Sequence, residues 1–138
     1  MTAADAIRRA EQVLPGSAAP DGEQDPRWQA IIEVAEYISE ESEAAWEFIA
    51  RWGKYEDEDL RAVIATCALE HLLEKHFDTF FLRVEAAARS SPAFADTVLR
   101  CWKLGQAELP ANARRFESLQ EQCRERLDNK QMQRTKRG

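Results

Sequence analysis

The stretch DEDLRAVIATCALEHLLEKH, from Asp57 to His76, decides the fold. Plotted at 100° per residue, its apolar residues cover almost every side of a helix. A surface helix has one apolar stripe, whereas a helix that is apolar nearly all round is buried on both sides. Acidic residues open the stretch, and Lys75 precedes His76 in its last turn, as the helix macrodipole favours. The sequence therefore predicts a central, buried helix.

Apolar residues at helical spacing predict further helices on both sides of this stretch. Two of them open with a capping side chain followed by proline, at Asp25-Pro26 and at Ser91-Pro92. No segment shows the alternation that is typical of a strand. Short connections make neighbouring helices antiparallel, so we expect an all-α fold of six or seven helices arranged as stacked helical hairpins. The other predicted helices span 2–14, 26–39, 42–52, 79–89, 92–104 and 111–128.

The length of 138 residues suits one domain. We expect an N-terminal helix and a Pro- and Gly-rich linker over 1–25, a single helical domain over 26–128, and a basic, disordered tail over 129–138. Whether the N-terminal helix docks on the domain is left open by the sequence. The four tryptophans are expected mostly in the core by their spacing, and Trp28 belongs to the predicted apolar stripe of helix 26–39.

Part of the central stretch resembles the second helix of a HEAT repeat. The matching pieces are Asp59-Leu60-Arg61, Ile64-Ala65, Ala68-Leu69 and Leu72. The resemblance makes helix 42–52 the first helix of that unit and implies a right-handed stack of helix pairs that binds other proteins. The fold is therefore expected to be HEAT-like or an irregular helical bundle. Membership of a small helical family of uncharacterised bacterial proteins is the other possibility.

Charge is spread unevenly along the chain. The net charge is −6, but residues 1–110 hold 21 acidic and 11 basic residues, whereas residues 111–138 hold 4 acidic and 8 basic ones. Contact with phosphate needs a basic face, so the acidic body argues against nucleic acid as a partner. It favours another protein with a basic surface.

The compartment predicted from the sequence is the cytoplasm. No apolar run approaches the ~18 residues of a membrane span, and the N-terminus lacks the pattern of a signal peptide. The three cysteines, at 67, 101 and 123, lie in helical apolar patterns without paired spacing. Such cysteines are typical of reduced, buried thiols in a cytosolic protein.

Glu70, His71 and Glu74 form the sharpest candidate for a metal or ligand site. Metal peptidases place two histidines four residues apart, but His71 and His76 are five apart and point about 140° away from each other. His71 and Glu74 share one face, as in some metal-binding bundles, although this chain has one such pair only. Cys67 also precedes His71 by one turn, but no glycine-rich turn supplies an oxyanion hole beside it. We therefore expect no catalysis and no cofactor, and keep a small metal- or ligand-binding bundle, possibly an enzyme, as the alternative.

The acids at the start of the central stretch are the predicted partner-binding surface. An acidic face would dock a basic partner, as in an immunity protein, an antitoxin or a regulatory adaptor. Trp52, close to a glycine, is the tryptophan that we expect at the rim of this surface. The predicted partner-binding residues are Trp52, Glu56, Asp57, Glu58 and Asp59.

A narrow apolar stripe on the last predicted helix allows self-association as a further possibility. Its residues follow one another at spacings of three or four, and the other faces of the helix are charged. The stripe consists of Phe116, Leu119, Cys123 and Leu127.

Overall fold

The computed structural model describes residues 2–15 and 25–137, the last seven of them by their backbone alone. The fold is all-α, as predicted, and the described residues include no strand. In chain order the elements are α1 (Ala3–Val13), α2 (Pro26–Ala35), α3 (Ser42–Trp52), α4 (Glu58–Ile64), the π-helical turn η1 (Ala65–Leu69), α5 (Glu70–Ser90), α6 (Pro92–Leu99), the 3₁₀ turn η2 (Gly105–Glu108) and α7 (Pro110–Arg137).

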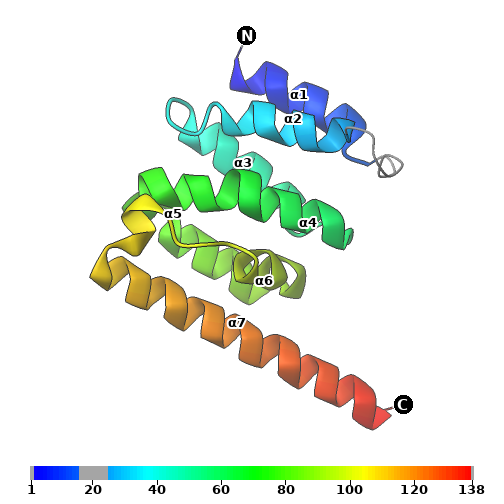
Figure 1. Ribbon diagram of the computed structural model, residues 1–138. Coiled ribbons are helices and arrows are strands. Elements are labelled where there is room, and N and C mark those ends of the chain that lie inside the picture. The colour runs from blue at the N-terminus through cyan, green and yellow to red at the C-terminus, as the bar shows by residue number, and fades with distance from the viewer. Residues whose placement is uncertain (1, 16–24, 138) are drawn as a thin grey trace.

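The helices are stacked from the N-terminal end of the molecule to the C-terminal end (Figure 1). Consecutive helices pack on one another, α1 on α2, α5 on α6 and α6 on α7. The N-terminal helix does dock on the body, because four of its apolar side chains are completely buried. These are Ala3, Ala6, Ala10 and Leu14. Most of the linker predicted between α1 and α2 lies outside the described residues.

The predicted helix starts are confirmed at α2 and α6. Asp25 accepts a hydrogen bond from the backbone N–H of Arg27, and Pro26 takes the first helical position. Ser91 caps α6 through the N–H of Phe94. At the N-terminus, Thr2 and Asp5 form a reciprocal capping box, which satisfies two donors that the first turn of a helix leaves free.

The central stretch is buried on both sides, as its pattern predicts. Leu60 and Ile64 on one side, and Leu69 and Leu72 on the other, are fully inaccessible to solvent. The helix is not uniform, however, because the π-helical turn η1 separates α4 from α5. Such turns widen a helix by one residue and shift the faces of the residues that follow.

The predicted break after His76 is a bend within α5 and not a gap between two helices. His76 has non-helical backbone angles, φ −139° and ψ 43°, and α5 continues to Ser90. Asp78, which lies between the two predicted helices, is an exposed residue inside α5. The helix continues because Phe77, Phe80 and Phe81 keep its inner face buried across the bend.

Three helix ends differ from those predicted. α2 ends at Ala35, and a turn carries the buried Ile38. α6 ends at Leu99, so residues 101–108 form a non-α segment that the sequence places partly inside a helix. α7 runs to Arg137, and residues 129–137, predicted as a disordered tail, continue the helix.

Two tryptophans are placed differently from the prediction. α2 buries Arg27, Ile31 and Val34 and leaves Trp28 at 44% exposure, so its buried stripe is rotated from the predicted one. Trp102, expected inside helix 92–104, is 74% exposed. Within residues 2–15 and 25–137, no helix combines the length and apolar character needed to cross a membrane.

Candidate functional site

The acidic residues that open α4 are held by a buried arginine. Arg27 is 1% exposed, and its guanidinium donates to Asp25 at 3.2 Å and to Asp57 at 3.0 Å. Asp59 accepts a further hydrogen bond from it at 3.4 Å. Arg27 thus orients Asp57 and Asp59, but one guanidinium does not neutralise three carboxylates, and these two side chains remain 38% and 54% exposed.

The other predicted members of that face lie in different surroundings. Trp52 is 6% exposed and packs against Tyr55, so it is a core residue and not a rim anchor. Glu58 is exposed and pairs with Arg100 at 2.5 Å. Glu56 is exposed, and its backbone carbonyl accepts a hydrogen bond from Arg61. Of the predicted face, Glu56, Glu58 and Asp59 are therefore exposed, and Asp57 is half-buried.

Asp57 makes folding sensitive to acid. Burial is the largest influence on its carboxyl and raises its pKa, but hydrogen bonds from Arg27 and from the N–H groups of Leu60 and Asp59 together lower that pKa below its ordinary value. A carboxyl with a lowered pKa in the folded state stabilises the fold above its unfolded pKa, and this stabilisation is lost as the pH falls through the folded pKa.

We therefore expect the melting temperature to fall as the pH drops below about 4, near the ordinary range of a carboxyl. Asp57→Asn should weaken this dependence, since asparagine keeps the helix cap without the charge. Thermal melts between pH 7 and 2 test this, with Glu40→Gln on the exposed turn before α3 as the control. Parallel curves for Asp57→Asn and the parent chain would contradict the assignment.

The candidate metal site is only partly assembled. His71 Nδ1 lies 2.9 Å from Glu74 Oε1, so the predicted pair is real. The carboxylate of Glu70 is used elsewhere, since it accepts a hydrogen bond from the N–H of Trp102 at 2.9 Å. In the part of the chain that the structure describes, no three His, Cys, Asp or Glu side chains are grouped so that they would hold a metal ion.

The cysteines are placed for packing. Burial raises the pKa of the Cys101 thiol well above its ordinary value, and the charge of Glu70 adds to this. Burial also raises the pKa of Cys123, against the opposing charge of Arg126. A thiol with a raised pKa is a poor nucleophile. Cys67 Sγ lies 4.0 Å from Thr66 Oγ1. The ring of His71 is hydrogen-bonded to the carboxylate of Glu74.

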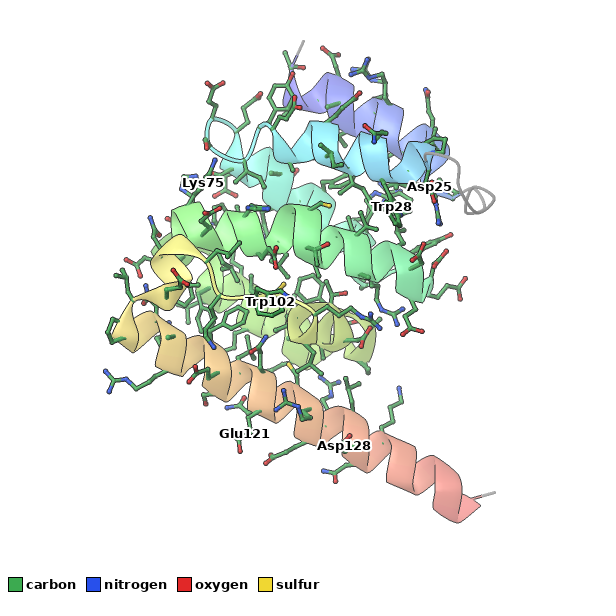
Figure 2. All side chains as sticks on the ribbon, in the orientation of Figure 1. Asp25, Trp28, Lys75, Trp102, Glu121 and Asp128 are labelled. Atoms are coloured by element: carbon green, nitrogen blue, oxygen red, sulfur yellow. The ribbon has the colours of Figure 1, made fainter. Side chains whose placement is uncertain are left out.

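Residues 101–108, between α6 and α7, form a segment that we call the strap. In Figure 2 it crosses in front of the helices and carries Trp102. Gln106 ties it to the bend of α5, because its side chain donates to the carbonyl of Lys75 at 2.8 Å and accepts from the N–H of Phe77 at 2.9 Å. The bend frees these backbone groups, and Gln106 satisfies them.

Other contacts hold the first part of the strap and its middle. Glu70 fixes the backbone of Trp102, and Gln120 of α7 donates to the carbonyl of Cys101 at 3.2 Å. Gly105 has a φ of +50° and lies so close to α5 that a Cβ there would be 2.9 Å from the carbonyl oxygen of Glu74. The strap therefore has a fixed conformation that leaves the Trp102 side chain in solvent.

Gln106→Ala should destabilise the fold by about 1–2 kcal/mol, because it removes two hydrogen bonds to the backbone of α5. Chemical denaturation measures this loss. Gln122→Ala, an exposed glutamine on α7, is the matched control and should change stability by less than about 0.5 kcal/mol. Equal effects of the two substitutions would show that Gln106 does not hold the bend.

A cavity of about 510 Å³ lies between the strap and α7. It is lined by Cys101, Trp102, Lys103, Glu108, Ala113 and Gln120. Lys103 is paired with Glu117 at 2.8 Å, whereas the structure shows no ion pair at the exposed Glu108 within the described residues. The cavity thus combines an exposed aromatic ring with an unpaired carboxylate.

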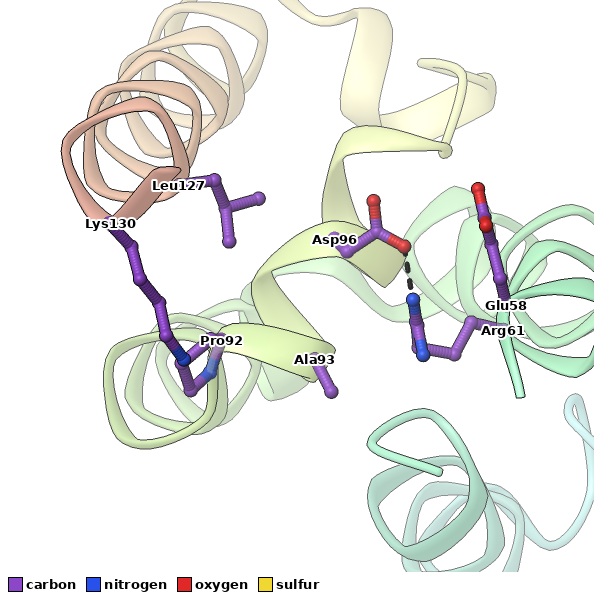
Figure 3. Close-up of a pocket in the computed structure, with 7 residues that line it drawn as sticks. All are labelled: Glu58, Arg61, Pro92, Ala93, Asp96, Leu127 and Lys130. Atoms are coloured by element: carbon purple, nitrogen blue, oxygen red, sulfur yellow. Dashed lines mark hydrogen bonds and ion pairs between the residues drawn. The ribbon is translucent and has the colours of Figure 1, made fainter. Parts of the chain in front are cut away.

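A second groove, of about 520 Å³, lies where α4, α6 and α7 meet (Figure 3). On its wall, Asp96 accepts hydrogen bonds from both Arg61 and Arg100 at 3.0 Å. Leu127 points toward this groove from α7 (Figure 3). The groove offers a less distinctive chemistry than the cavity beside the strap.

The stripe on α7 that the sequence offers for self-association is used within the chain. Phe116 is completely buried, and Leu119 and Cys123 are 2% and 4% exposed. Leu127 is partly buried against the same core. Because the stripe covers α6 and the second half of α5, it does not form a free surface for a second copy.

Sequence reasoning missed Arg27, Gln106 and Trp102 as important residues. Arg27 has a recognisable signal, because it shares helical spacing with Ile31 and Val34 and follows a capping aspartate. The exposure of Trp102 and the role of Gln106 have no such signal, since both depend on how the strap meets α5.

The model of a family of unknown function (DUF6869) matches residues 17–123. No curated protein and no solved structure matches the chain significantly.

Proposed function

The chain belongs to a family of unknown function (DUF6869), and we propose from its structure that it is a non-catalytic module that binds another protein. The observation that carries this proposal is the exposure of Trp102, which is 74% on a strap held by hydrogen bonds of the Glu70, Gln106 and Gln120 side chains. Exposing a tryptophan to water is unfavourable, and tryptophan is enriched among the residues that dominate binding energy at protein interfaces.

The fixed conformation of the strap supports the same function. A loop that orders only on binding loses conformational entropy, which weakens the complex. Here Glu70, Gln106 and Gln120 already hold the backbone around Trp102. A partner would therefore bury the ring without first having to order the loop.

Besides Trp102, Trp28 and Ile32 form an exposed apolar pair. They are one turn apart on α2 and are 44% and 41% exposed. Single exposed apolar residues are normal on any protein, but an adjacent pair of large ones favours an interface. We count this pair as a separate exposed apolar site for a protein partner.

The acidic body supports a partner with a basic surface. We propose a role of the kind played by immunity proteins, antitoxins or regulatory adaptors, which cover a basic site on another protein. The three free cysteines favour a reducing compartment such as the cytoplasm. The four acidic residues that open α4 stay predicted partner contacts, and three of them, Glu56, Glu58 and Asp59, are exposed, whereas Asp57 is half-buried.

Affinity purification of the tagged chain from its native cells tests the proposal when two sets of variants are compared. Trp102→Ser with Ile32→Ser should lose the specific partner and keep the melting temperature, because both side chains are exposed. Glu36→Gln with Glu40→Gln, on the exposed turn after α2, is the control that should keep the partner. If the apolar variants recover the same proteins as the parent chain, the proposal is wrong.

A further inference from the structure

The cavity between the strap and α7 has a chemistry that selects its occupant. Trp102 contributes an exposed indole ring, and Glu108 contributes an exposed carboxylate from η2. Both residues line the same cavity. A ring face and a carboxylate in one cavity are the two groups that a planar cation recognises, the first by a cation–π contact and the second by an ion pair.

The charge balance of the cavity leaves one negative charge. Lys103 lines it too, but Glu117 neutralises its ammonium at 2.8 Å. Gln120 faces the cavity with an amide that is already bonded to the carbonyls of Val98 and Cys101. Glu108 is therefore the lining residue whose charge is left for a guest.

The chain itself shows that its aromatic rings accept guanidinium groups. Arg115 lies over the Phe81 ring at 4.6 Å, and Arg83 lies over the Phe80 ring at 5.1 Å. Tryptophan binds cations more strongly than phenylalanine does. No guanidinium of the described residues is recorded over Trp102, so this ring is open to one from another protein.

We propose that this cavity binds an arginine side chain of a partner protein, stacked on Trp102 and paired with Glu108. The proposal rests on the protein-binding function above and names the residue type that the partner presents. Guanidinium is favoured over ammonium because it is planar, stacks on aromatic faces and forms two parallel hydrogen bonds with a carboxylate. The volume of about 510 Å³ exceeds that of one side chain, so the neighbouring backbone of the partner also fits.

The test uses the full chain with ¹⁵N-labelled tryptophan and a short probe peptide, acetyl-Gly-Arg-Gly-amide. The indole N–H signal of Trp102 is identified by its loss in Trp102→Phe. The same peptide with citrulline in place of arginine is the control, because citrulline keeps the shape and removes the charge. We expect the arginine peptide to shift the Trp102 signal with saturation at millimolar concentration, and the citrulline peptide to leave it unchanged.

Glu108→Gln should weaken the binding of the arginine peptide by about fivefold or more, as expected for the loss of an ion pair in a partly enclosed site. Glu36→Gln, an exposed carboxylate on a distant turn, should have no effect. Equal shifts from both peptides, no shift from either, or unchanged affinity in Glu108→Gln would each overturn the proposal. If the Trp102→Ser and Ile32→Ser variants still lose their partner in that case, the protein-binding function stands and the arginine assignment alone falls.

Discussion

Arg27→Met should destabilise the fold by about 3–5 kcal/mol, because it leaves the buried carboxylate of Asp25 without the Arg27 cation. Asp25 is 9% exposed and Arg27 is 1% exposed, so water does not replace the lost contact. Methionine fills much of the same volume, which separates the electrostatic effect from the loss of packing. Chemical denaturation of the two proteins at neutral pH measures the difference.

Two variants make this prediction specific. Arg51→Met removes an ion pair with Glu11 in which the side chains are 65% and 34% exposed, and it should cost less than about 1 kcal/mol. Asp25→Asn should restore part of the stability lost in Arg27→Met, since the buried charge is removed while the helix cap remains. If Arg27→Met is no more harmful than Arg51→Met, the buried cluster does not hold α2 against α4.

Phe116→Ala should cost about 3–5 kcal/mol, because its ring is completely buried between α7 and the body. Its ring centroid lies 6.5 Å from that of Phe81, so the substitution opens a cavity in the core. Leu109→Ala is the control, since Leu109 is 55% exposed and should lose little stability.

The same variant separates two roles for the apolar stripe of α7. If the stripe formed a dimer interface, Phe116→Ala would change the sedimentation coefficient and leave the monomer stable. The packing of Phe116, Leu119 and Cys123 within the chain predicts a large loss of stability and an unchanged sedimentation coefficient for the folded protein. A stable variant with a lower oligomeric state would contradict that packing.

The general fold could be predicted because it depends on patterns within each helix. The all-round apolar stretch from Asp57 to His76 predicted a buried central element, and the pairs Asp25-Pro26 and Ser91-Pro92 predicted two helix starts. These signals involve neighbouring residues, so tertiary contacts do not have to be known to read them.

The candidate site could not be predicted in the same way, because it depends on contacts across the chain. Asp57 is predicted as a partner contact, but it also accepts a hydrogen bond from Arg27, thirty residues earlier. Trp52 is buried although the sequence predicts it at a surface, and Trp102 is exposed although the sequence predicts it in a helix of the core. Helical spacing places a residue on a face, but it does not say what covers that face. Gln106 matters only because the bend at His76 leaves the carbonyl of Lys75 and the N–H of Phe77 without helical partners.

The central claim is that the chain binds a protein through the exposed tryptophan on the strap. The most direct measurement is the affinity of the purified partner for three forms of the chain, the parent, Trp102→Ser and Glu56→Lys with Glu58→Lys. The account predicts a loss of at least about tenfold for Trp102→Ser, in the range of a hot-spot residue, with an unchanged melting temperature. Full affinity in Trp102→Ser together with lost affinity in the Glu56 and Glu58 variant would contradict it and place the interface at the acidic turn.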